Sequence, residues 1–239
     1  MHLLYRIPLL GVHFLGATVL GLVLCLLRPF RPSNSRLCAQ LYAWPALWLI
    51  GLRVRHVGTA HFPIDRPCVV VANHQSNWDL VVVGSVVPPN TVSIGKKSLR
   101  WVPLFGQLYW LAGNVLIDRA DRQRARQTLG RAADALTRDR TSIWVFPEGT
   151  RNRGDNMLPF KHGAFALAVE TGVPIVPVCC SAYLTHLSLR RWRNGCARID
   201  VLPPIETAGM TATDVPELMA ECCRRMQRVI DPPAAAVGG

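Results

Sequence analysis

The sequence predicts an α/β fold in which helices cover a sheet, with an apolar helical hairpin ahead of this domain. From about Arg53 onward, short apolar runs alternate with longer segments of helical spacing. This alternation is typical of a sheet packed against helices. Before Arg53, two stretches lack charged residues and are apolar enough to contact a membrane. A chain of 239 residues is long enough for one such domain and an appended segment.

The first uncharged stretch is Pro8–Leu27, which contains no Asp, Glu, Lys or Arg. As a helix, its twenty residues span about 30 Å, the thickness of a bilayer core. We interpret this stretch as a retained membrane anchor. A signal peptide is the alternative, but no convincing small-residue cleavage site precedes Arg28 and Pro29.

The second uncharged stretch, Leu37–Leu52, is short for a bilayer crossing and contains Pro45, two Trp and one Tyr. Trp and Tyr prefer the membrane–water interface. The two stretches therefore predict a helical hairpin, which either crosses the bilayer or dips into one leaflet. Three arginines separate the stretches, at positions 28, 31 and 36. The positive-inside tendency disfavours two full crossings, because these arginines would then lie on the far side from the main domain.

Six short apolar runs after the hairpin predict strands. They are Cys68–Ala72, Val92–Gly95, Asn114–Ile117, Ser142–Phe146, Val173–Val178 and Ala197–Leu202. The run Val173–Val178 includes Pro174 and Pro177. Since proline cannot donate a hydrogen bond to a neighbouring strand, this run is expected to be an edge or irregular strand.

Segments with apolar residues at helical spacing predict helices between these strands. They are Trp78–Val87, Asp121–Arg140, Gly163–Thr171, which Gly172 ends, and Val215–Ile230. One face of the segment Asp121–Arg140 is rich in arginine and lies either in solvent or against a membrane. The chain thus divides into a membrane-anchoring segment, a main domain and a Pro-, Ala- and Gly-rich flexible tail. These are residues 1–52, 53–230 and 231–239.

Composition favours a lipid partner over nucleic acid. Lys and Arg outnumber Asp and Glu by 27 to 15, a formal charge of +12 that suits anionic lipids or phosphorylated substrates. No recognisable nucleic-acid-binding motif is present, so no nucleic acid partner is expected. The eight cysteines form no CxxC pair, and we expect them to be reduced, with no metal site and a domain that faces the cytoplasm.

The motif Asn73–Asp79 follows the first predicted strand and precedes a helix, a junction where α/β folds place reactive groups. His74 is suited to accept a proton near neutral pH. A loop that enters the helix can fold Asp79 back beneath the imidazole, where it accepts a ring N–H and sets the tautomer. By itself the pair is also compatible with a structural loop histidine.

Two further motifs carry candidate binding residues. The segment Phe146–Arg151 follows a strand, and its Gly149 permits a tight turn. Arg151 is suited to bidentate phosphate binding, and Glu148 could orient it or contact a hydroxyl. The segment Lys96–Arg119 places two lysines next to apolar residues, an arrangement able to hold a phosphate and an acyl chain. Taken singly, the first motif is better explained by an ordinary Pro-Glu-Gly turn with a solvated arginine, and the second is also compatible with surface lysines beside a core strand.

Together, the motifs resemble the four blocks of the glycerolipid acyltransferases, in the same order. The blocks are His74–Asp79, Gly113–Arg119, Phe146–Arg151 and Val173–Val178. The stretch from Lys96 to Trp110 also resembles the bacterial members, and the similarity covers about residues 65–205. The closest resemblance is to bacterial 1-acyl-sn-glycerol-3-phosphate acyltransferases. It implies a mixed sheet covered by helices.

This resemblance implies an enzyme that acylates the sn-2 hydroxyl of lysophosphatidic acid, giving phosphatidic acid for phospholipid biosynthesis. His74 would act as the general base and Asp79 would orient it. The acyl donor would be acyl-CoA or acyl-carrier protein, with no cofactor. The implied substrate-binding residues are Lys96, Lys97, Arg119, Glu148, Gly149, Thr150 and Arg151. The implied location is the bacterial inner membrane, with the active domain facing the cytoplasm.

Three alternatives stay open at this point. One is an acyltransferase for glycerol 3-phosphate or for another lysophospholipid. The second is a basic, membrane-anchored lipid-binding module without catalysis, in which nothing depends on His74. The third is a membrane-tethered hydrolase in which the histidine activates water.

Overall fold

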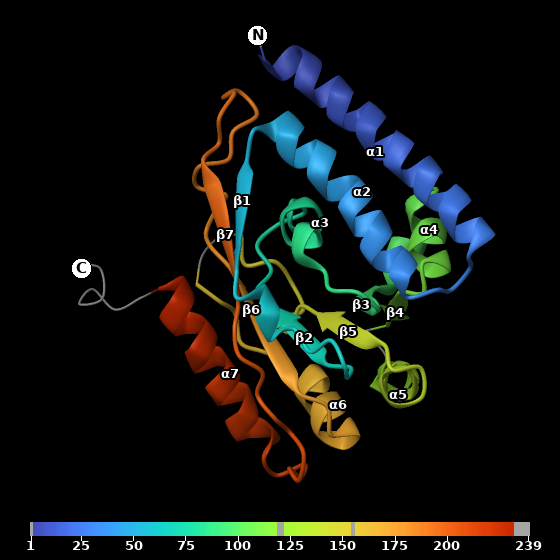
Figure 1. Cartoon of the computed structure of the whole chain (residues 1–239), viewed down its shortest axis with the longest axis vertical. Helices are drawn as coiled ribbons and strands as arrows, with labels where there is room; N and C mark the ends of the chain where they lie inside the picture. Colours follow the sequence, from blue (N-terminus) through green and yellow to red (C-terminus); the bar gives the residue numbers. More distant parts are fainter. Residues whose placement is uncertain (1, 119–121, 154–155, 232–239) are drawn as a thin grey trace.

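Seven strands form one mixed sheet in the computed structural model, which describes residues 2–118, 122–153 and 156–231 (Figure 1). The strand order is β1-β7-β6-β2-β5-β3-β4. All neighbouring strands run parallel except β6 and β7, so the mixed sheet that the resemblance implied is confirmed. The strands are β1 (Arg53–Val57), β2 (Val69–Ala72), β3 (Thr91–Lys96), β4 (Val115–Ile117), β5 (Ser142–Val145), β6 (Ile175–Cys180) and β7 (Cys196–Val201).

Helices cover both faces of this sheet (Figure 1). The α-helices are α1 (His2–Leu27), α2 (Ser33–Ile50), α3 (Asp79–Val82), α4 (Phe105–Leu111), α5 (Arg122–Thr137), α6 (Gly163–Thr171) and α7 (Val215–Ile230). Three short 3-10 helices are η1 (Thr59–His61), η2 (Val83–Val86) and η3 (Lys97–Trp101). The predicted helix Trp78–Val87 is therefore one α-helical turn, α3, continued by η2.

Side-chain alternation along β2 separates two hydrophobic cores. Val70 and Ala72 pack into the core beneath α2 and α3, whereas Val69 and Val71 pack into the core beneath α5, α6 and α7. Successive strand residues point to opposite faces, so a strand buried on both faces is apolar throughout. The sequence of β2, which is buried at every position, follows this rule.

The predicted N-terminal hairpin is present as α1 and α2, which lie side by side (Figure 1). The Thr18 hydroxyl and the Tyr42 hydroxyl are 2.6 Å apart between the two helices. Residues Leu4–Leu27 are long and apolar enough to cross a membrane, with a mean hydropathy of 2.3. Many apolar side chains of α1 remain exposed, including Leu4, Val12 and Leu26.

Strand β6 corrects one expectation. Its prolines favoured an edge position, yet β6 lies between β2 and β7 and all of its residues are buried. The missing N–H of Pro177 is tolerated because of where β7 ends. Pro177 faces Leu202, the first residue beyond β7, and accepts a 2.9 Å hydrogen bond from its N–H. The hydrogen bond that Pro177 cannot donate is therefore missing only where the pairing of β6 with β7 ends.

Strand β1 and helix α4 were not predicted. β1 alternates arginine with valine and lies at the edge of the sheet, paired only with β7. Its apolar residues are too few to stand out in the sequence. α4 begins after Leu104, a non-glycine residue with a φ of 62°. That conformation, which requires tertiary support, is difficult to read from sequence.

Truncation of Ile143 tests the core beneath α5, α6 and α7. Ile143 is fully buried in the central strand β5, so Ile143→Ala should lower the free energy of unfolding by about 2–5 kcal/mol. This corresponds to a melting temperature about 5–15 °C lower, measured in nonionic detergent. The control is Ile64→Ala, because Ile64 is 99% exposed and its loss should change stability little. Equal effects of the two changes would contradict the described core.

Candidate active site

The sequence motifs meet at one edge of the sheet. Strands β2, β5, β3 and β4 are parallel neighbours in that order, so their carboxyl ends share an edge. The loop with His74 follows β2, and the loop with Glu148 and Arg151 follows β5. Lys97 follows β3, and Asp118 follows β4. The strand order therefore places the loops that carry these motifs at one edge of the sheet.

His74 and Asp79 are in direct contact, as the loop geometry predicted. The distance from His74 Nδ1 to Asp79 Oδ2 is 2.6 Å. The same carboxylate oxygen accepts hydrogen bonds from the backbone N–H groups of Gln75 and Ser76, at 2.6 and 3.0 Å. Asp79 is the first residue of α3. The loop before α3 therefore curls around this carboxylate, which brings a residue five positions away beneath the imidazole.

Tyr183 holds the other oxygen of the Asp79 carboxylate. Its hydroxyl donates a 2.6 Å hydrogen bond to Asp79 Oδ1 and lies 3.1 Å from Ser76 Oγ. Tyr183 follows β6 and is 2% exposed. Burial and the adjacent carboxylate raise the pKa of Tyr183 far above its usual value, so the phenol stays protonated and donates. No spacing rule indicates this partner, because it lies 104 residues from Asp79.

The Asp79 contact leaves the second ring nitrogen of His74 available to substrate. When the carboxylate accepts the Nδ1 proton, the neutral imidazole presents a lone pair at Nε2. The imidazole stacks on Phe146, with 4.1 Å between ring centroids and an interplanar angle of 19°. The His74 side chain is 19% exposed, whereas the Asp79 side chain is 1% exposed. The pair can thus exchange a proton with a bound molecule through His74 alone.

Glu148 binds backbone groups of the site. Its side chain is buried, and its two oxygens accept hydrogen bonds from the N–H groups of His74 and Leu158, at 2.7 and 2.9 Å. Burial raises the pKa of Glu148, against the lowering effect of these hydrogen bonds. Glu148 therefore fixes the backbone of the His74 loop through hydrogen bonds. The sequence had indicated a contact with Arg151 or a hydroxyl, and not this role.

The two loops are also joined through their backbones. The N–H groups of Asn152 and Arg153 donate hydrogen bonds to the carbonyl groups of His74 and Gln75, at 2.8 and 3.1 Å. Gly149 has a φ of 73°, which allows the tight turn that the sequence predicted, and its N–H bonds to Phe146. Thr150 and Arg151 are exposed. Arg151 therefore lies on the loop that runs alongside the candidate base.

The remaining predicted binding residues are less tightly organised. Lys96 is exposed, and Lys97 Nζ forms a 2.9 Å ion pair with Asp118. An open depression of about 430 Å³ lies here, lined by Lys96, Lys97, Ser98, Arg100, Trp101, Ile117 and Asp118. Arg119 lies outside the described residues. The structure thus places two lysines at the same sheet edge as His74, without showing their contact with Arg151.

Comparisons with known proteins show which family the chain resembles. The sequence profile of the family described as Acyltransferase matches residues 53–181. A 1-acyl-sn-glycerol-3-phosphate acyltransferase from Haemophilus influenzae is 41% identical over 95% of this chain and 94% of that protein. The protein of that name from Escherichia coli is 39% identical over 95% of this chain and 92% of its own.

The fold has a solved counterpart as well. The crystal structure of the 1-acyl-sn-glycerophosphate (LPA) acyltransferase PlsC from Thermotoga maritima superposes with a TM-score of 0.73. It covers 97% of both chains at 24% sequence identity, a likeness that concerns the fold. The sequence identity to the bacterial relatives, the family profile and the order of the motifs lead to one conclusion: this chain belongs to the 1-acyl-sn-glycerol-3-phosphate acyltransferase family of enzymes.

Proposed function

We propose that this enzyme transfers an acyl group from acyl-CoA or acyl-carrier protein to the sn-2 hydroxyl of 1-acyl-sn-glycerol 3-phosphate, giving phosphatidic acid. The observation that carries the proposal is the 2.6 Å contact between His74 Nδ1 and a buried Asp79 carboxylate. It orients Nε2 as a general base. No nucleophilic side chain is required, since the acceptor hydroxyl fills that role.

The reaction proceeds through a tetrahedral intermediate. His74 Nε2 removes the hydroxyl proton as the oxygen attacks the thioester carbonyl carbon, and a C–O bond forms. The intermediate collapses with cleavage of the C–S bond, and the thiolate takes the proton back from the His74 imidazolium. Asp79 stabilises that imidazolium throughout. The atoms balance without a cofactor.

Basic residues at the same sheet edge are suited to bind the glycerol phosphate. Arg151 is exposed on the loop that is hydrogen-bonded to the His74 loop, and its guanidinium can bind phosphate in a bidentate manner. Lys96 and Lys97 add positive charge after β3. Lys97 is already paired with Asp118, so Lys96 is the stronger candidate. Gly149 and Thr150 shape the turn before Arg151, and Arg119 is carried over from the family motif.

The exposed apolar surface of α1 supports a place at the membrane. The acceptor and the product both reside in lipid, and the positive net charge favours anionic headgroups. We therefore place the enzyme at a bacterial inner membrane with its active domain in the cytoplasm, where the thioester donors are made. Incubation with labelled acyl-CoA or acyl-carrier protein, with either lysophosphatidate or glycerol 3-phosphate, tests the proposal. Label in phosphatidic acid supports it, and label in lysophosphatidate made from glycerol 3-phosphate contradicts it.

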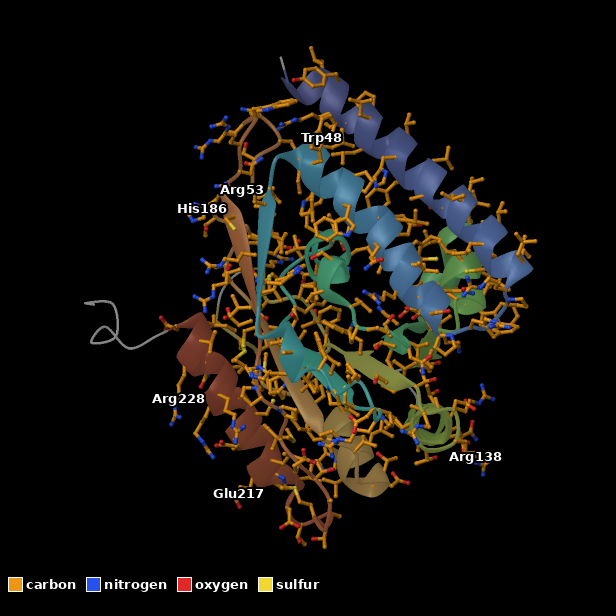
Figure 2. The ribbon with its side chains drawn as sticks, in the orientation of Figure 1. Trp48, Arg53, Arg138, His186, Glu217 and Arg228 are labelled. Atoms are coloured by element: carbon orange, nitrogen blue, oxygen red, sulfur yellow. The ribbon has the colours of Figure 1, made fainter. Side chains whose placement is uncertain are left out.

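Removal of the imidazole tests the base. His74→Ala should lower kcat for acyl transfer to lysophosphatidate by about 10²–10⁴-fold, because it removes the group that accepts the hydroxyl proton in the proposed reaction. His186→Ala is the matched control, since His186 is an exposed histidine elsewhere on the molecule (Figure 2). Activity of the purified His74→Ala protein near that of the control would eliminate His74 as the base.

Removal of the Tyr183 hydroxyl tests the positioning of Asp79. In Tyr183→Phe the carboxylate loses one donor and holds the protonated imidazole more tightly, so the acidic limb of the kcat/KM pH profile should move to higher pH. Tyr42→Phe removes a buried hydroxyl from the hairpin. Both variants should lose about 1–2 kcal/mol of stability. Only Tyr183→Phe should shift the pH profile, and a shift of equal size in Tyr42→Phe would refute the assigned role.

Substitution of Arg151 tests phosphate recognition. Arg151→Ala should raise KM for lysophosphatidate by about 10–100-fold, the loss expected for a charge-assisted contact. KM for the thioester should stay near its wild-type value. Arg151→Lys keeps the charge but not the bidentate geometry. Its KM for lysophosphatidate should therefore lie between the values of wild-type protein and Arg151→Ala. An equal rise in both KM values would argue against a phosphate contact.

A further inference from the structure

A basic and aromatic turn between β6 and β7 has no part in the proposed reaction. Four consecutive side chains of this turn, Arg190–Arg193, are exposed, and Trp192 is 53% exposed. None of the three guanidinium groups forms an ion pair with another residue in the described part of the chain. We refer to Arg190–Arg193 as the basic turn.

Arg6 attaches the basic turn to helix α1. The Arg6 side chain is 1% exposed although it lies within the apolar stretch Leu4–Leu27. Its guanidinium donates hydrogen bonds to the carbonyl groups of Leu189 and Trp192, at 3.2 Å each, and of Arg191. It also lies 4.8 Å from the centroid of the Trp192 ring. The first turns of α1 and the basic turn therefore form one unit, as their proximity in Figure 1 also shows.

Asn194 attaches the basic turn to the end of helix α2. Its side-chain amide donates a 2.6 Å hydrogen bond to the carbonyl of Ile50, and its N–H donates a 2.8 Å bond to the carbonyl of Gly51. Gly51 has a φ of 67°, and a Cβ at this position would lie 1.9 Å from the Trp192 carbonyl oxygen. Only glycine fits this close approach. The turn is thus held at a set position relative to both helices of the hairpin.

The surroundings of the basic turn indicate which kind of partner it binds. Next to it, the outer surface of α1 exposes Leu4 and Ile7, which are suited to the lipid interior. Trp favours the boundary between lipid tails and headgroups, and arginine binds phosphate in a bidentate manner. Three arginines that form no ion pair with the described residues flank a tryptophan here, in a turn fixed beside an apolar helix. This arrangement matches the headgroup layer of an anionic bilayer.

We propose that the basic turn binds the phosphate groups of anionic phospholipids and thereby seats this end of the hairpin at the membrane surface. This inference rests on the membrane placement in the proposed function, but not on the acyl transfer chemistry. The occupant is the bilayer itself. Free phosphate should compete only as weakly as other salts of equal ionic strength, because the proposed occupant is a layer of many headgroups and not a single ion.

The test compares the full chain with two triple variants of equal charge. Arg190→Gln/Arg191→Gln/Arg193→Gln removes the basic turn. The control, Arg131→Gln/Arg138→Gln/Arg228→Gln, removes three exposed arginines on the other side of the sheet from α1 (Figures 1 and 2). Arg131 lies in α5, Arg138 directly follows α5, and Arg228 lies in α7. Flotation measures partition into vesicles of phosphatidylcholine alone or with roughly 30 mol % phosphatidylglycerol. Acyl transfer in neutral detergent micelles checks that each variant is folded.

Wild-type protein should prefer the anionic vesicles, and the basic-turn variant should lose that preference by about tenfold or more, given the attraction per arginine. The control should keep the preference, and both variants should keep their activity in micelles. Equal losses in both variants would show a general effect of net charge, and no loss in either would show that the turn does not touch lipid. Both results overturn the proposal.

Two further measurements show whether a failure concerns the membrane placement or the basic turn itself. Absence of wild-type protein from both kinds of vesicle overturns the membrane placement together with the basic turn, while activity in micelles would still stand. Quenching by brominated phosphatidylglycerol gives direct evidence of contact. The fluorescence of Trp192 is obtained as the difference between wild-type protein and Trp192→Phe. Brominated lipid should quench this difference signal, and a signal that stays unquenched contradicts contact between Trp192 and lipid.

Discussion

The carboxylate of Asp79 is the point on which the site depends. It is nearly inaccessible to water, and it accepts hydrogen bonds from the His74 ring, from two backbone N–H groups and from the Tyr183 hydroxyl. A buried carboxylate is costly without such partners, and with them it becomes a rigid negative charge. That charge selects the tautomer of His74 and supports the imidazolium of the proposed reaction.

Three neighbouring parallel strands of the mixed sheet bring the groups of the site together. β2 supplies His74, and β6, its neighbour on one side, leads to Tyr183. β5, the neighbour on the other side, leads to Glu148, which accepts a hydrogen bond from the His74 N–H. Each of the three strands is buried for most of its length, so close packing fixes the positions from which the loops begin. The burial of the strands thus preorganises the candidate base, which is a principal requirement of catalysis.

The N-terminal hairpin packs directly against the elements that hold the Asp79 carboxylate. α2 packs against α3, the short helix that begins with Asp79, through the core that contains Leu47, Ile50, Val81 and Val82. Its end is tied to the turn between β6 and β7 through Asn194. The helices that are suited to contact lipid are therefore coupled through packed side chains to the elements that hold the carboxylate.

Much of this arrangement was determined by the sequence alone. Short apolar runs predicted six of the seven strands, and the loop between strand and helix predicted the contact of His74 with Asp79, as found. The edge strand β1 was missed because its arginines interrupt the apolar signal. The prolines of β6 led us to expect an edge or irregular strand, whereas β6 is an interior strand. The roles of the remaining predicted binding residues stay predictions.

The tertiary structure alone decided which distant groups complete the site. Tyr183, Glu148 and Arg6 make their contacts with residues 104, 74 and more than 180 positions away. Such pairs depend on strand order and on which loops share an edge, and neither propensity nor local spacing contains that information. Local chemistry therefore identified the candidate base, while the packing of the sheet supplied the partners that hold it in place.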